Sequence, residues 1–179
     1  MKQKQDLLSA LDIVILIKIV ALDKTPWLQI DLADSLNISQ SEVSKSLQRL
    51  NRARLISSMK GEKIIRRQNI LDLLQYGVRY MIPQWPGPIT RGIPTAHAGP
   101  PLASIIRSSE AYVWPYGRGK VRGQSIVPLY PTVPEAASKD AKFYEIIALV
   151  DALRVGRARE QQLGMVELKK RIMNGEFDN

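Results

Sequence analysis

The stretch PWLQIDLADSLNISQSEVSKSLQRLNRARLI, residues 26–56, predicts two short amphipathic helices joined by a tight polar turn. Thr25 as a cap and Pro26 as a first helical residue mark the start of the first helix. Ser39 and Glu42 have the spacing of a reciprocal capping box, which marks the start of the second. The second helix carries an apolar face (Val43, Leu47, Leu50) and a polar face (Ser44, Lys45, Gln48, Arg52). The polar face is therefore expected to meet solvent or a ligand.

The positive charge of the chain is concentrated in and just after this second helix. The whole chain carries a net charge of +9. Residues 45–67 contain eight cations and one acid, Glu62, whereas the last 45 residues have no net charge. A one-sided basic zone of this kind is typical of a surface that binds phosphates. A solvated basic surface without a partner is the alternative.

A short β-hairpin is predicted directly after the second helix. Residues 55–58 and 64–67 have strand character, and Gly61 in the turn between them can adopt a positive φ. Lys60 and Lys63 would flank the tip. A basic hairpin beside a polar helix can lie along a nucleic-acid backbone or in its minor groove.

The segment LADSLNISQSEVSKSLQRLNRARLI, residues 32–56, resembles the helix-turn-helix of winged-helix transcriptional regulators, most nearly the MarR-like group. The resemblance extends over roughly residues 7 to 82 and implies a homodimer that binds double-stranded DNA. Arg54 departs from the family pattern, since it stands where glycine is usual. A left-handed backbone at that position would cost roughly 1 kcal/mol.

These observations assign candidate roles to the polar side chains of the helix and hairpin. Short hydroxyl and amide side chains can reach base edges, and cations can reach phosphates. The predicted base-reading residues are Gln40, Ser41, Ser44 and Gln48. The predicted phosphate-binding residues are Lys45, Arg49, Arg52, Arg54, Lys60, Lys63 and Arg66.

The expected fold is mainly α with a small β-hairpin wing, in three segments. Residues 1–82 form the winged helix-turn-helix domain, which begins with a buried apolar helix at 11–22 and closes with a helix at 69–82 capped by Asn69. Residues 83–134 form an irregular strap, because they contain ten of the eleven prolines. Residues 135–179 form a C-terminal helical segment, capped by Ser138 or Asp140 and bent or broken near Gly156. The resemblance implies that this segment dimerises with the N-terminal helix across a two-fold axis, although it could instead dock onto a partner protein.

The strap carries five aromatics, among them Trp114, and three arginine–glycine steps, at 91–92, 118–119 and 122–123. The aromatics are expected to anchor it, while its arginines are either solvated or bind phosphates, as single-strand sites do. His97 is the only histidine, and with no second histidine or cysteine it is expected to make backbone hydrogen bonds rather than bind a metal.

The sequence thus indicates a DNA-binding transcriptional regulator, a homodimeric repressor, rather than an enzyme. An antitoxin-like or adaptor protein whose C-terminal half docks onto a partner enzyme is the alternative. No cofactor or metal is expected. The absence of cysteine favours a cytoplasmic location, and the 11–22 segment is too short and too charged for a membrane span.

Overall fold

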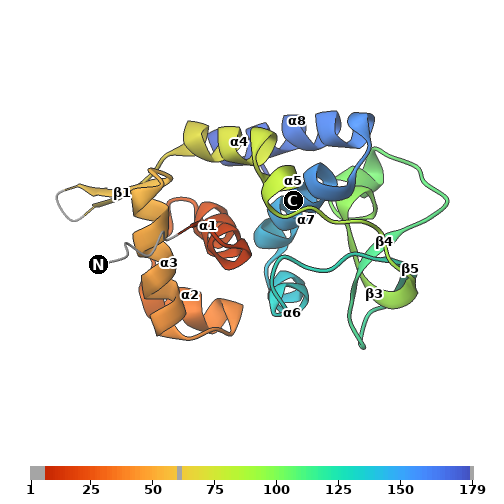
Figure 1. Cartoon of the computed structure of the whole chain (residues 1–179), viewed down its shortest axis with the longest axis horizontal. Helices are drawn as coiled ribbons and strands as arrows, with labels where there is room; N and C mark the ends of the chain where they lie inside the picture. Colours follow the sequence, from red (N-terminus) through yellow and green to blue (C-terminus); the bar gives the residue numbers. More distant parts are fainter. Residues whose placement is uncertain (1–6, 60–61, 178–179) are drawn as a thin grey trace.

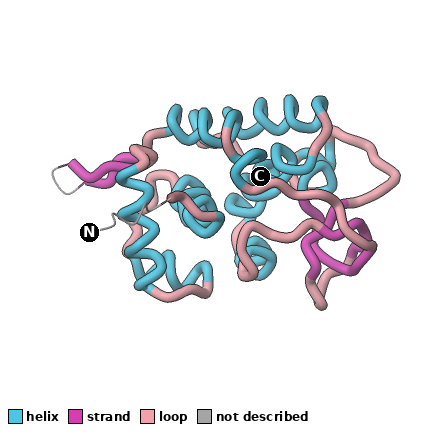
Figure 2. Tube along the Cα trace, viewed as in Figure 1, coloured by secondary structure: helices cyan, strands magenta, loops and turns pink. Residues whose placement is uncertain are grey.

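The computed structural model describes residues 7–59 and 62–177 and has a mixed α/β fold (Figures 1 and 2). The helices are α1 (Ala10–Leu22), α2 (Gln29–Leu36), α3 (Gln40–Arg52), α4 (Arg67–Tyr76), α5 (Val78–Met81), α6 (Val133–Lys139), α7 (Ala141–Val155) and α8 (Ala158–Asn174). The strands are β1 (Ile56–Met59), β2 (Glu62–Ile65), β3 (Ile89–Thr95), β4 (Tyr112–Pro115) and β5 (Val121–Ser125).

Helices α1 and α7 pack against each other near the centre of the molecule (Figure 1). The α1 residues Ile13 to Ile17 are at most 1% exposed, because α2 and α3 cover α1 from one side and α7 from another. A helix that is apolar nearly all round is expected to be buried in this way. The apolar helix predicted at 11–22 is thus confirmed as buried, and its cover comes from α2 and α3 together with α7 of the C-terminal half.

Ionic contacts at both ends of α7 fix it in place. Lys18 of α1 lies 2.6 Å from Asp140, whose carboxylate also caps α7 by accepting from the Phe143 amide at 3.0 Å. At the other end of α7, Asp151 accepts hydrogen bonds from Trp114 Nε1 at 2.6 Å, Thr95 Oγ1 at 2.8 Å and the neighbouring Arg154 at 2.6 Å. Buried charges need such partners. α7 is therefore held to both α1 and the β3–β5 sheet.

The sequence predicts an irregular strap for the Pro/Gly-rich segment, but the structure differs. It folds into a small sheet in which each of the three strands β3, β4 and β5 pairs with both of the others (Figure 2). β3 runs antiparallel to β4 and β5, which are parallel to each other. The aromatics do anchor the segment, because Trp114 is fully buried and hydrogen-bonded to Asp151. The segment also ends earlier than predicted, since α6 begins at Val133.

Several helix boundaries differ from those predicted. α2 begins at Gln29 rather than at Pro26, with Asp31 accepting from the Leu28 amide at 2.7 Å. The helix expected at 69–82 begins at Arg67 and divides at Gly77 into α4 and α5. Asn69 does not cap it but donates to the Arg54 carbonyl at 2.7 Å. The break near Gly156 and the Asp140 cap are confirmed, as α7 ends at Val155 and α8 begins at Ala158.

Candidate nucleic-acid interface

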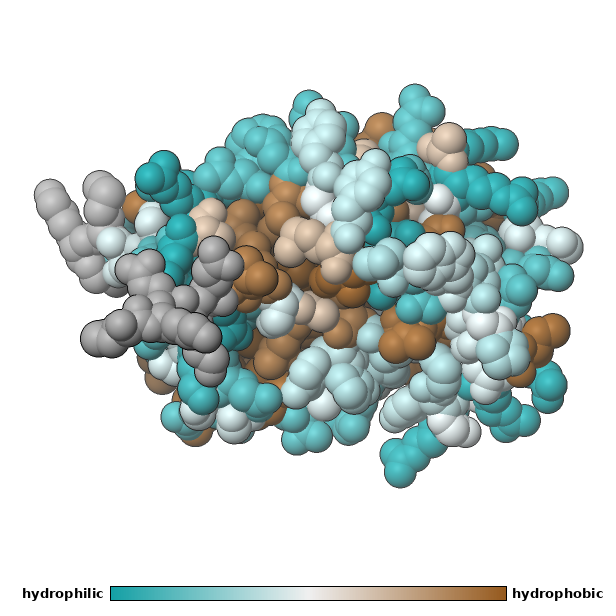
Figure 3. Space-filling model, in the orientation of Figure 1, coloured by the Kyte–Doolittle hydropathy of each residue, from teal (hydrophilic) through white to brown (hydrophobic). Residues whose placement is uncertain are grey.

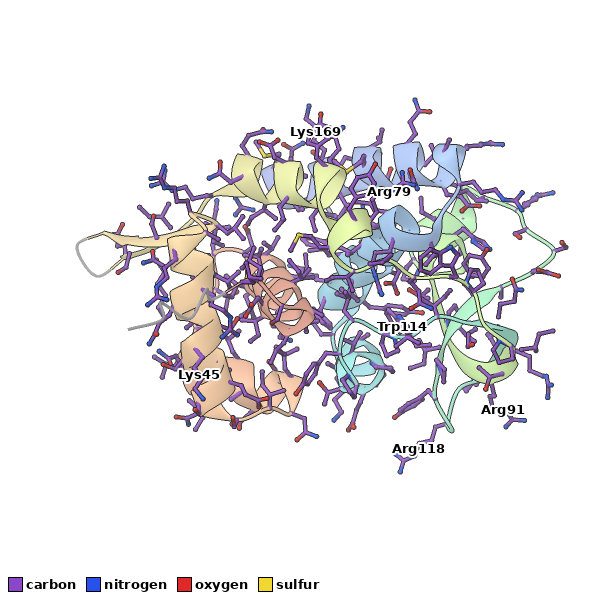
Figure 4. The ribbon with its side chains drawn as sticks, viewed as in Figure 1. Lys45, Arg79, Arg91, Trp114, Arg118 and Lys169 are labelled. Atoms are coloured by element: carbon purple, nitrogen blue, oxygen red, sulfur yellow. The ribbon has the colours of Figure 1, made fainter. Side chains whose placement is uncertain are left out.

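Helix α3 has one buried side and one exposed side. Val43, Ser46 and Leu50 are fully buried against the core. The opposite side carries Ser41, Lys45, Gln48 and Arg52, all exposed, with Gln40, Ser44 and Asn51 beside them toward the hairpin. The four predicted base-reading residues therefore lie together on the accessible part of the helix. Lys45 projects at the α3 end of the molecule (Figure 4).

The one acid of α3 is removed from this exposed side. Glu42 accepts from the backbone amide of Ser39 at 3.0 Å and from its hydroxyl at 3.0 Å, and Ser39 Oγ accepts from the Glu42 amide at 3.2 Å. The predicted capping box is confirmed. The hydrogen bonds from the Ser39 backbone and side chain lower the pKa of Glu42 below its ordinary value. Tyr130 donates to the same carboxylate at 3.2 Å, which ties the start of α3 to the C-terminal half of the chain.

Arg49, predicted to bind phosphate, has a carboxylate partner within the chain. Its guanidinium forms a bidentate ion pair with the fully buried Asp12 of α1, with Nε–Oδ2 and Nη2–Oδ1 distances of 2.8 and 2.7 Å. Burial raises the pKa of Asp12, but the hydrogen bonds from Arg49 and from Ser9 outweigh it and hold the pKa below its ordinary value. Arg49 therefore orients α3 on α1, and it is not a free phosphate-binding cation. Arg67, also in the basic zone, pairs with Asp23 at 2.7 Å.

The exit from α3 is left-handed at Arg54, where φ is +57°. The Arg54 amide donates to Asn51 O at 3.0 Å and the Leu55 amide to Leu50 O at 3.0 Å, the two bonds of a Schellman motif. Leu55 and Leu50 are both buried, as the motif requires. The conformation expected for the family's glycine is thus adopted by an arginine, whose side chain is exposed.

A groove of about 310 Å³ separates α3 from the hairpin. Ser44, Gln48 and Asn51 line it from α3, and Trp27 lines it from the segment before α2. Lys63 of β2 stands over the Trp27 ring, 3.6 Å from its centroid, and donates to the Trp27 carbonyl at 3.1 Å. The sequence did not single out Trp27 or Asn51. Asn51 could have been found from its place one turn beyond Gln48 in the predicted helix.

The hairpin follows α3 as predicted, with the register Ile56↔Ile65 and Ser58↔Lys63. Lys63 and Arg66 are exposed beside the groove, whereas the predicted contact Lys60 and the turn residue Gly61 lie outside the described residues. Arg52 and Arg54 are exposed at the end of α3. Of the predicted cations that the structure describes, Lys63 lines this groove, and Arg54 and Arg66 line a neighbouring pocket that shares Asn51 with it.

His97 makes the backbone hydrogen bond that was expected of it. Its Nε2 lies 2.8 Å from the Glu110 carbonyl, and its ring contacts Tyr112 edge-on, with 4.5 Å between centroids. Within residues 7–59 and 62–177, no three histidine or acidic side chains come together as a metal site would require.

Comparisons with protein-family models, with characterised proteins and with solved structures returned no match. None of the helices in the described part of the chain is long and apolar enough to cross a membrane.

Proposed function

We propose that this chain is a sequence-specific, double-stranded DNA-binding transcriptional regulator that inserts α3 into the major groove. The observation that carries the proposal is the exposed side of α3, which holds hydroxyl, amide and cationic side chains without an acid. The hydroxyl and amide groups can hydrogen-bond to base edges, and the cations can contact phosphates. The hairpin next to α3 has the position of a wing, which favours the winged helix-turn-helix interpretation and the MarR-like resemblance.

Each side chain has a distinct role in this proposal. Gln40, Ser41, Ser44 and Gln48 read bases, and Lys45, Arg52, Arg54, Lys63 and Arg66 hold phosphates. Arg49 acts as a positioning residue, because its ion pair with Asp12 sets the orientation of α3 on α1. The Trp27 ring under Lys63 limits where that ammonium can lie.

The proposal is tested by titrating two labelled duplexes, the chain's own upstream DNA and a scrambled sequence, at 150 mM salt and at several lower and higher salt concentrations. Lys45→Ala should weaken both complexes equally and flatten the dependence of log K on log salt by about 0.9. Gln48→Ala should weaken the specific complex alone, by roughly 1–3 kcal/mol. Lys169→Ala, on the opposite edge of the molecule (Figure 4), is the matched control and should change neither. Equal affinity of the wild type for both duplexes would contradict sequence-specific binding.

We further infer a homodimer, but not through α7. Residues of α7 from Phe143 to Arg154 are almost all buried within the chain, so α7 has no free apolar face to offer. Large exposed apolar and aromatic side chains occur instead on α4–α5 and just after it: Tyr76, Tyr80, Met81 and Trp85. Apolar residues also gather near the centre of the face in Figure 3, in the region of α1 and α5. Gel filtration of wild type and Tyr80→Glu, expected as dimer and monomer, tests this face.

The adaptor or antitoxin-like alternative is favoured by the same exposed aromatics, because a partner enzyme could cover them. It predicts a chain that binds no DNA alone and forms a complex with the product of a neighbouring gene. A Tyr80→Glu variant that loses that complex while remaining folded would support the adaptor. Specific DNA binding by the purified chain would count against it.

A further inference from the structure

The three arginine–glycine steps of the β3–β5 sheet follow one structural rule. In each step the glycine is buried and the arginine before it is exposed. A Cβ atom on Gly92 would lie 1.9 Å from the Trp114 carbonyl oxygen, and one on Gly119 or Gly123 would lie 2.3 Å from another backbone segment. The fold therefore requires the glycines, because the strands touch backbone to backbone.

No comparable requirement of the fold explains the arginines. Arg91 and Arg122 face each other directly in the antiparallel β3–β5 register. Like charges at such opposed positions destabilise a sheet. Among the described residues, neither side chain makes a hydrogen bond or ion pair, and both are exposed. Two guanidinium groups held side by side and left without an anion have the geometry of a site for one.

The cations around this pair extend it into a surface. Arg118 and Lys120, in the connection between β4 and β5, are also exposed. Glu135 of α6 has its pKa lowered mainly by Lys139, with which its carboxylate pairs at 2.7 Å, and Arg118 adds to that lowering. We call Arg91, Arg118, Lys120 and Arg122 the basic sheet surface. It presents four cations with little compensation from the rest of the chain.

We propose that the basic sheet surface binds the phosphodiester backbone of double-stranded DNA, as a second contact separate from α3. Guanidinium groups match phosphate oxygens in charge and in fork geometry. This inference rests on the proposed function for the identity of the ligand, but it uses none of the α3 residues.

The place of this surface in the molecule fits a second contact on the same duplex. α3 and the β3–β5 sheet lie at opposite ends of the long axis, and Lys45 and Arg91 with Arg118 project from those two ends (Figures 1 and 4). A compact chain of this length has a radius of gyration of about 16 Å and hence a diameter of about 40 Å. One turn of DNA spans about 34–36 Å. The basic sheet surface would therefore meet the backbone about one turn away from the bases that α3 contacts.

The test compares Arg91→Gln/Arg122→Gln with Arg159→Gln/Lys169→Gln, which removes the same charge from two exposed positions on α8. Duplexes of about 8 and 24 base pairs are used, since the shorter is below one turn of about 10 base pairs and cannot span both ends. Circular dichroism and thermal melting confirm that both variants are folded. A third variant, Arg91→Lys/Arg122→Lys, keeps the positive charge but loses the paired N–H donors of the guanidinium group.

On the 24-base-pair duplex, Arg91→Gln/Arg122→Gln should weaken binding roughly tenfold at low salt and flatten the salt slope by about 1.8, or 0.9 for each lost phosphate contact. On the 8-base-pair duplex it should bind like wild type. Arg159→Gln/Lys169→Gln should resemble wild type on both, and the lysine variant should keep the wild-type slope with weaker binding.

The outcomes separate this inference from the proposed function. If the glutamine variant equals the control on the long duplex while Lys45→Ala still weakens binding, the second contact is wrong and the α3 proposal stands. If the glutamine variant loses binding and Lys45→Ala does not, the basic sheet surface binds DNA and the α3 assignment is wrong. Loss of binding to vesicles of anionic phospholipid, with no effect on DNA, would overturn the proposal in favour of a lipid surface.

Discussion

At the α3 end of the molecule, exposed cations stand on a helix whose other side is fixed by aliphatic residues and by the Asp12–Arg49 ion pair. At the β3–β5 end, exposed arginines alternate with glycines that let the strands come into contact. The first end is stabilised by side chains, and the second by close backbone approach. Arg49 is therefore structural, because it pairs with a buried carboxylate. The arginines that precede the buried glycines of the sheet are exposed and accessible to a ligand.

The largest effect is expected from Gly92→Ala. Its Cβ would lie 1.9 Å from the Trp114 carbonyl oxygen, so the β3–β4 pair must separate, and we expect a loss of about 3 kcal/mol or more in the free energy of unfolding. Gly117→Ala, in the same segment but with no atom within 4 Å of its Cβ, is the matched control. Urea denaturation measures both. Similar stability of the two variants would show that close backbone approach does not govern this end.

Arg49→Met should have the next largest effect, because it leaves the Asp12 carboxylate buried without its cation. We expect a loss of about 2 kcal/mol, less than for a fully buried pair because the Arg49 side chain is 21% exposed. Lys45→Met on the same helix should change stability by no more than about 0.5 kcal/mol. If Arg49→Met were as stable as Lys45→Met and bound DNA as weakly as Lys45→Met does, Arg49 would be a phosphate contact.

The difference in unfolding free energy between wild type and Arg49→Met should depend on pH, which gives a second test of the Asp12–Arg49 ion pair. The folded pKa of Asp12 lies below its ordinary value of 3.8, so its ion pair contributes fully above pH 3.8 and is lost as the pH falls through the folded pKa. In Arg49→Met, burial should raise the pKa of the Asp12 carboxyl, and protonation then relieves the destabilisation. The gap in unfolding free energy between wild type and Arg49→Met should therefore shrink between about pH 6 and pH 3. Urea midpoints across that range test it, and a constant gap would contradict it.

The smallest effect is expected from Arg54→Gly, and it should be stabilising. Arg54 has a φ of +57°, a conformation that glycine adopts without steric cost. We expect a gain of about 1 kcal/mol and a higher melting temperature. DNA affinity should fall slightly if the Arg54 side chain contacts phosphate. Arg66→Gly, outside the left-handed region, should show no gain in stability.

Local signals in the sequence predicted much of the α3 end. The Ser39–Glu42 box and the apolar repeat of α3 depend on residues within one or two turns of each other. The partner of Arg49 could not be predicted in this way, because Asp12 is 37 residues distant and meets it only through the packing of α1 on α3. Charge alone therefore indicates a phosphate contact for Arg49, whereas the packing of α1 on α3 gives it a buried carboxylate as partner.

The β3–β5 sheet was missed for a related reason. Strand prediction relies on alternating apolar side chains, but here Gly92 and Gly123 face inward, and Pro94 lies within β3. A helix at α6 was overlooked because Pro134 was taken as part of the loop, although proline is tolerated in a first helical turn. The burial of Asp151 cannot be predicted from its own helix, since its donors Thr95 and Trp114 come from distant strands.

The contact between Lys18 and Asp140 has a practical consequence for anyone who would transplant the α3 module. α7 packs against α1, and Lys18, the lysine of α1, pairs with Asp140 at the N-cap of α7. A fragment of residues 1–82 alone would therefore expose the apolar residues Ile13 to Ile17. An exchange of specificity between proteins would have to be made at the surface of α3. The α3 end and the C-terminal half therefore share one core through α1 and α7.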